Sequence, residues 1–124
     1  MSRKKILLVD DDYVFLKTII IALKDKYNVE TANNGVECFN KINNIKPDLI
    51  VLFIVMRHLR EGINVLKKLT SDNETEKIPI ILLAGKDEVF KIKEHCDESM
   101  IQEHVWFEKP VEPEVLKNII EELI

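Results

Sequence analysis

Five short apolar runs alternate with amphipathic segments along the chain, and this alternation constrains the fold more than any other feature. The runs lie at residues 6–9, 27–31, 49–54, 78–83 and 105–107. The first, third and fourth are continuously apolar, as expected for strands that are covered on both faces of a parallel sheet. Residues 27–31 instead alternate between polar and apolar side chains, which predicts a strand at the sheet edge.

Helical patterns fill the gaps between these runs. Five segments carry apolar or small residues at helical spacing: Leu16, Ile19, Ile20 and Leu23; Val36, Phe39 and Ile42; Gly62, Val65, Leu66 and Leu69; Val89, Ile92 and Cys96; Leu116, Ile119, Ile120 and Leu123. We expect Asp12 to cap the first helix, Gly62 to open the third and Pro113 to lie in the first turn of the last. The alternation predicts an α/β fold with a doubly wound parallel sheet.

Length and composition indicate one globular domain spanning residues 1–124. Apolar residues make up 46% of the chain and charged residues 32%, so a core can form without disulfides or metal. The net charge of −4 argues against nucleic-acid binding. The longest apolar run, Leu49–Met56, is too short to span a bilayer, and no signal peptide is predicted. Cys38 and Cys96 lack CxxC spacing and are expected to be reduced core thiols in a cytoplasmic protein.

The residues that follow the strands are the candidate functional residues, because ligands of doubly wound sheets bind outside the carboxyl ends of the strands. They are Asp10, Asp11 and Asp12 after the first strand, Phe53 in the third, Ala84 after the fourth and Lys109 after the fifth. No GxGxxG or GxxxxGK[ST] motif is present to hold a nucleotide. Acids on one strand and a lysine on another suggest a magnesium-assisted phosphoryl site. Such a site needs an acceptor carboxylate where this chain has Phe53.

Together these segments resemble the receiver domain of two-component response regulators over essentially the whole chain. The matching segments are ILLVDDD at 6–12, PDLIVLFIVM at 47–56, PIILL at 79–83 and Lys109-Pro110. The resemblance implies a flavodoxin-like, five-stranded parallel sheet in the order 2-1-3-4-5 with five helices. In that family an aspartate ending the third strand takes a phosphoryl group from a histidine kinase. Two acids bind Mg²⁺, a Thr or Ser ending the fourth strand contacts the phosphoryl group, and a lysine ends the fifth.

Several of the family's functional positions are altered in this chain. Asp10 and Asp11 match the acidic pair and Lys109 matches the lysine, but Phe53 occupies the acceptor position. The hydroxyl position holds Ala84, and Trp106 stands where a switching aromatic usually lies. We expect Trp106 to serve in packing, and Lys109 to form a structural ion pair with the acids. The phenyl ring of Phe53 either extends the core or plugs the site so that one conformation is fixed.

A phenyl ring can be neither a nucleophile nor a metal ligand, so the resemblance implies a degenerate receiver. We expect no phosphorylation at the usual site, no catalytic residue and no enzyme activity. No cofactor is required, and Asp10 and Asp11 would bind Mg²⁺ weakly at most. The expected role is a protein-interaction module whose partner is a histidine kinase, an output domain or another regulator. A homodimer is an open alternative, and neither nucleic acid nor membrane is an expected partner.

Two other functions remain open on the sequence. The domain could be a phosphorelay receiver that accepts the phosphoryl group on Asp10, Asp11 or Asp12 instead. It could also be an unrelated small α/β enzyme that binds flavin. The absence of a Ser-, Thr- or Gly-rich phosphate loop after Val9 disfavours the flavin interpretation.

Overall fold

The sheet has the predicted architecture. The computed structural model describes residues 3–10, 12–54, 59–84, 94, 105–108 and 112–124. Within them lie the strands β1 (Lys5–Val9), β2 (Asn28–Ala32), β3 (Leu49–Ile54), β4 (Ile80–Ala84) and β5 (Val105–Glu108). The strands are parallel and follow the order β2-β1-β3-β4-β5, so β2 is the edge strand that its alternating sequence predicts. The predicted doubly wound, flavodoxin-like order is confirmed.

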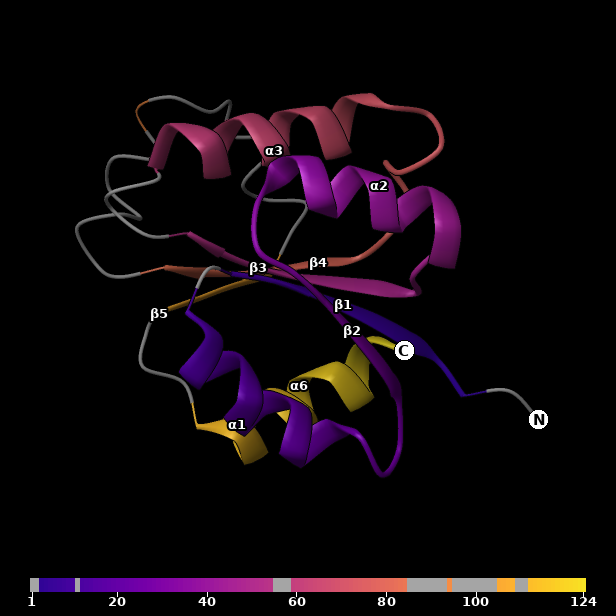
Figure 1. Ribbon diagram of the computed structural model, residues 1–124, viewed down its shortest axis with the longest axis vertical. Helices are drawn as coiled ribbons and strands as arrows, with labels where there is room; N and C mark the ends of the chain where they lie inside the picture. Colours follow the sequence, from indigo (N-terminus) through magenta and orange to yellow (C-terminus); the bar gives the residue numbers. More distant parts are fainter. Residues whose placement is uncertain (1–2, 11, 55–58, 85–93, 95–104, 109–111) are drawn as a thin grey trace.

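Helices cover both faces of the sheet (Figure 1). The described helices are α1 (Tyr13–Leu23), α2 (Gly35–Ile45), α3 (Leu59–Ser71) and α6 (Pro113–Leu123). Helices α1 and α6 lie on one face, and α2 and α3 lie side by side on the other (Figure 1). The expected fourth helix, which carries Val89, Ile92 and Cys96, falls outside the described residues.

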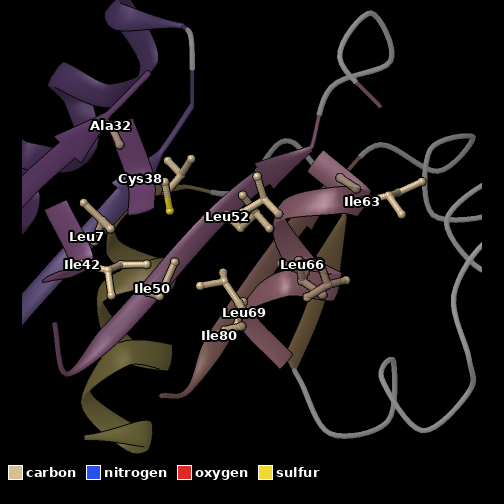
Figure 2. Close-up of a cluster of buried hydrophobic side chains, with 14 residues drawn as sticks. Leu7, Ala32, Cys38, Ile42, Ile50, Leu52, Ile63, Leu66, Leu69 and Ile80 are labelled. Atoms are coloured by element: carbon tan, nitrogen blue, oxygen red, sulfur yellow. The ribbon is translucent and has the colours of Figure 1, made fainter. Parts of the chain in front are cut away.

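The central strand β3 is buried on both faces and divides the core into two clusters. Ile50 and Leu52 pack with the inner sides of α2 and α3, as Figure 2 shows. Leu49, Val51 and Phe53 point the other way and join residues of α1 and α6. The side chains of a strand alternate between its two faces. Because helices cover both faces of this sheet, β3 needs apolar residues on both and has no polar face.

Side-chain caps start two helices near the carboxyl edge of the sheet. The Oδ1 atom of Asp12 accepts a hydrogen bond from the backbone N–H of Phe15 at 3.2 Å, which confirms Asp12 as the cap of α1. Asn34 caps α2 in the same way, through the N–H of Glu37 at 2.9 Å. Pro113 begins α6, as predicted, because its missing N–H is not needed there.

One residue of the apolar stripe predicted for α2 does not face the core. Ile42 is buried and Phe39 is partly buried, as predicted, and Cys38 is buried as the expected core thiol. Val36 was expected on the same face but is 74% exposed. The reason is tertiary: α2 begins so close to α3 that a Cβ added at Gly35 would lie 3.0 Å from Cγ2 of Val65. This close approach fixes the rotation of α2.

Two smaller expectations for the helices also need correction. Helix α3 begins at Leu59 rather than at Gly62, so the glycine lies inside its first turns. In α6, Leu116 and Ile120 are buried as expected, but Leu123 is 36% exposed because it lies in the last turn, at the helix end.

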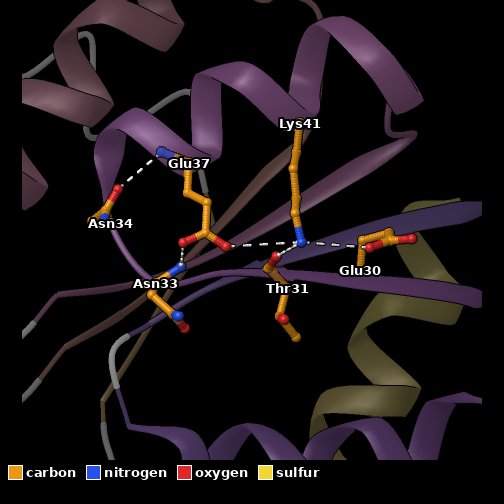
Figure 3. Close-up of polar contacts among 6 residues, drawn as sticks. All are labelled: Glu30, Thr31, Asn33, Asn34, Glu37 and Lys41. Atoms are coloured by element: carbon orange, nitrogen blue, oxygen red, sulfur yellow. Dashed lines mark hydrogen bonds and ion pairs between the residues drawn. The ribbon is translucent and has the colours of Figure 1, made fainter.

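A lysine on α2 ties this helix to the edge strand (Figure 3). The Nζ atom of Lys41 donates to the carbonyl oxygen of Thr31, and it lies 3.6 Å from Glu30 Oε2 and 3.9 Å from Glu37 Oε1. Glu37 in turn accepts the N–H of Asn33 through Oε2 at 3.4 Å. Each partly exposed ion pair contributes about 0–1 kcal/mol. Their structural effect is to hold α2 against β2 and to position the loop between them.

The orientation of α2 can be tested by thiol reactivity. Burial raises the pKa of the Cys38 thiol to about 12. In a Cys96→Ser background, iodoacetamide should react with Cys38 on the order of a hundredfold slower than with the thiol of a Val36→Cys, Cys38→Ser variant, because the thiolate is the reactive form. As the pH rises, the rate at residue 36 should level off above the ordinary thiol pKa of about 8.5, whereas the rate at Cys38 should start lower and still be rising at that pH. Equal rates at the two positions would show that α2 is rotated differently.

Candidate functional site

A hollow of about 120 Å³ lies at the carboxyl edge of the sheet, where ligands of this fold class bind. Its walls come from β1, β3, the loop between β2 and α2, and the start of α3. The lining residues are Val9, Asp10, Asn33, Asn34, Gly35, Leu52, Phe53, Glu61, Gly62 and Val65. Segments that are far apart in the sequence therefore converge on the place that the strand order predicts.

Asp10 directly follows the last residue of β1 and is buried, with 5% of its surface exposed. Its backbone N–H donates to the carbonyl oxygen of Ala32 at 3.0 Å, which continues the pairing of β1 with β2. Because Val9, the last residue of β1, is paired with Leu52, Asp10 lies level with Phe53 on β3. The structure thus brings Asp10 and Phe53 together, and both line the hollow.

The Phe53 ring is part of the core rather than an exposed side chain. It is 5% exposed and belongs to the cluster beneath α1 and α6. Its centroid lies 5.0 Å from that of Phe15 on α1, with an interplanar angle of 81°, which is an edge-to-face contact. The apolar core therefore extends to the position where the sequence predicts that a receiver would carry its acceptor carboxylate.

The other predicted site residues fall partly outside the described ranges. Ala84 is the last residue of β4, has no exposed surface, and pairs with Ile54 on β3. Trp106 lies in β5, paired with Leu82, but its side chain is outside the description. Asp11 and Lys109 also lie outside the described residues, so the expected ion pair between them stays a prediction.

Sequence reasoning missed the side of the hollow that α2 and α3 form. The Oε1 atom of Glu61 accepts the backbone N–H of Gly35 at 2.8 Å and so joins the first turns of the two helices. The cap residue Asn34 could have been found from its place before a helical pattern. No local signal points to Glu61, because its partner lies 26 residues earlier in the chain.

The polar residues that line the hollow carry carboxylates and amides. The carboxylates of Asp10 and Glu61 and the amides of Asn33 and Asn34 line it, beside the apolar side chains. Among the described residues, no group of three or more His, Cys, Asp or Glu side chains is placed to hold a metal ion. None of the helices in these ranges has the length and apolar character that a membrane crossing requires.

Comparison with known proteins gives a consistent result. Residues 6–121 match the family described as the response regulator receiver domain. Over 120 residues, or 96% of this chain, the sequence is 34% identical to the "probable transcriptional regulator ycf29" of Porphyra purpurea, of which it covers 56%. It is 40% identical over 71% of its length to the "alkaline phosphatase synthesis transcriptional regulatory protein PhoP" of Bacillus subtilis, covering 36% of that protein. The chain thus spans about half or less of these relatives.

Solved structures show the same fold. The chemotaxis response regulator CheY4 of Vibrio cholerae aligns with a TM-score of 0.77 and 24% identity, over 99% of this chain and 100% of that one. At this identity the likeness supports the fold alone. It agrees with the sheet order described above.

The contact between Phe53 and Phe15 should have a measurable energy. Phe53→Ala is expected to lower the free energy of unfolding by about 3–5 kcal/mol, because a large buried ring is removed. In a double-mutant cycle with Phe15→Ala, the coupling energy should be about 0.5–1.5 kcal/mol. Urea denaturation of the four proteins measures both values. Purely additive losses would mean that the two rings do not interact.

Proposed function

Because the chain belongs to the family of response regulator receiver domains, which act in signal transduction, we propose that it is an atypical receiver that is not phosphorylated at the usual site. Its role is that of a protein-interaction module. The observation that carries this proposal is the position of Phe53, which is packed on Phe15 and lies level with Asp10 at the end of the sheet.

Phosphoryl transfer to a receiver needs an oxygen nucleophile, a metal-bound phosphate and nearby positive charge. Phe53 supplies no oxygen, and the bulk of its buried ring would fill space that an acceptor carboxylate and a metal ion share. Asp10 has the chemistry of a Mg²⁺ ligand, and Asp11 would have to complete the pair. With one carboxylate fewer than the family pattern, Mg²⁺ binding is expected to be weak, and no cofactor is required.

The response to a phosphoryl group would also be impaired. The family reads the modification through a hydroxyl at the end of the fourth strand, and Ala84 offers only a methyl group there. Even if phosphorylation occurred nearby, this position could not donate a hydrogen bond to it. Loss of both the acceptor and the hydroxyl supports a signalling role that does not depend on phosphorylation.

The partner of such a module is another protein of a signalling pathway: a histidine kinase, an output domain or another regulator. The relatives above are named as transcriptional regulators and are longer than this chain, which supports an output domain as one such partner. As for receivers in general, the proposed location is the cytoplasm, and no enzyme activity is proposed.

The main alternative places the phosphoryl group on a different aspartate. Asp12 is a poor candidate because its carboxylate caps α1. Asp10 is 5% exposed, which restricts the approach of a phosphodonor. Asp11 lies outside the described residues. The experiment that follows separates this alternative from the proposal.

Intact-mass spectrometry after incubation with Mg²⁺ and acetyl phosphate should show no added phosphoryl group, because no acceptor stands at residue 53. A receiver with an intact acceptor aspartate, treated in parallel, confirms that the donor is active. One stoichiometric phosphoryl group on this chain would contradict the proposal. Peptide mapping to Asp10, Asp11 or Asp12 would then establish the alternative.

The placement of residue 53 beside the acids can be tested with Phe53→Asp. This variant should be less stable than wild type, but Mg²⁺ should raise its melting temperature, because binding to the folded state alone stabilises it. Phe53→Asn is the matched control, since it has nearly the same shape without the charge. If Mg²⁺ affects wild type, Phe53→Asn and Phe53→Asp equally, residue 53 does not lie at a metal site.

A further inference from the structure

A second depression lies on the outer surface between α2 and α3, which run side by side (Figure 1). We call it the α2–α3 groove. It has a volume of about 640 Å³ and is lined by Gly35, Val36, Phe39, Asn40, Arg60, Glu61, Asn64, Val65 and Lys68. It borders the hollow at the sheet edge, because both include Gly35, Glu61 and Val65. No predicted site residue lies in it.

The groove presents apolar surface to solvent. Val36 is 74% exposed, whereas Cys38 and Ile42 of the same helix are buried. Phe39, one turn away, is only partly buried against the core. The Nζ atom of Lys68 lies 4.3 Å from the centroid of the Phe39 ring, so a cation and an aromatic face are held together. Such a pair can contact an apolar and an acidic group at once.

The charge of the groove is opposite to that of the whole chain. Arg60 and Lys68 line it, and its carboxylate Glu61 already accepts the N–H of Gly35. The chain as a whole carries a net charge of −4. A local excess of positive charge beside exposed apolar groups favours an acidic partner, because complementary charge steers association and selects the partner.

Polar groups between these charges suit a peptide backbone. Asn40 on α2 and Asn64 on α3 both line the groove. An asparagine amide both donates and accepts hydrogen bonds, as a peptide group does. The groove therefore combines an apolar contact surface, amides and two cations.

We propose that the α2–α3 groove docks a short acidic segment of a partner protein. A large apolar side chain of that segment packs on Val36 and Phe39, and its carboxylates pair with Arg60 and Lys68. This inference rests on the proposed role as an interaction module, and it assigns that role a surface and a partner chemistry. A second copy of this chain is a poorer occupant, because a symmetric contact would bring two grooves with the same excess of positive charge together.

Val36→Asp is the central test, and Val14→Asp is its control. Both valines are the second residue of a helix, and they are 74% and 75% exposed, but Val14 lies on α1 across the sheet. An acid in the first turn of a helix is tolerated, so both variants should fold. Circular dichroism and thermal melts verify this before binding is measured.

The probes are two libraries of short fluorescent peptides. Each peptide has a central Leu, Phe or Trp; the flanking residues are Asp and Glu in one library and Lys and Arg in the other. Fluorescence anisotropy should detect binding of the acidic library alone, and added salt should weaken it. Val36→Asp should weaken binding about tenfold or more, Arg60→Glu likewise, and Val14→Asp should leave it unchanged.

Amide chemical shifts from NMR should change in α2 and α3 when the peptide is added. Changes confined to other elements, equal binding of the basic library, or equal affinity of the Val36→Asp and wild-type proteins would each overturn the inference. A dimer in sedimentation experiments that Val36→Asp dissociates would also overturn it, since a second copy would then occupy the groove.

Repeating the titration with Mg²⁺ and acetyl phosphate separates this inference from the proposed function. Equal affinity with and without the phosphodonor is expected. Peptide binding that requires phosphorylation would contradict the proposed function and leave the groove assignment intact. If neither phosphorylation nor peptide binding is observed, the groove assignment is wrong, whereas the proposed function is not contradicted.

Discussion

Burial of β3 on both faces is the constraint on which the rest of the structure depends. The strand lies between β1 and β4, and its side chains alternate between the two core clusters. Helices must therefore cover both faces of the sheet, as they do through the connections between its parallel strands. The same packing makes the carboxyl ends of β1 and β3 meet at one edge, where the hollow lies.

Phe53 continues this apolar packing to the end of the strand. In a receiver that accepts phosphate, the corresponding position has to leave the core and present an oxygen to solvent and metal. Here the ring stays in the cluster with α1 through its contact with Phe15. Phe53 therefore serves packing, and this supports the proposed role as an interaction module.

Helix α2 connects the two depressions. Lys41 holds it against β2, and the bond from Gly35 to Glu61 holds its first turn against α3. These contacts turn Cys38 inward and Val36 outward, so they shape the inner hollow and expose the apolar part of the α2–α3 groove. One helix orientation therefore sets the form of both surfaces.

The sequence by itself determined the alternation of strands and helices, the edge position of β2, the cap at Asp12 and the place of Pro113 in the first turn of α6. These follow from hydrophobic period and local helix-start chemistry, which short segments encode. The strand order and the meeting of Asp10 with Phe53 were implied by the resemblance of the sequence to receiver domains. Only the tertiary structure decided the rotation of α2, the start of α3 and the contact of Glu61 with Gly35. Those depend on the packing of segments distant in the chain, because a helix with apolar residues on more than one side takes its orientation from its neighbours.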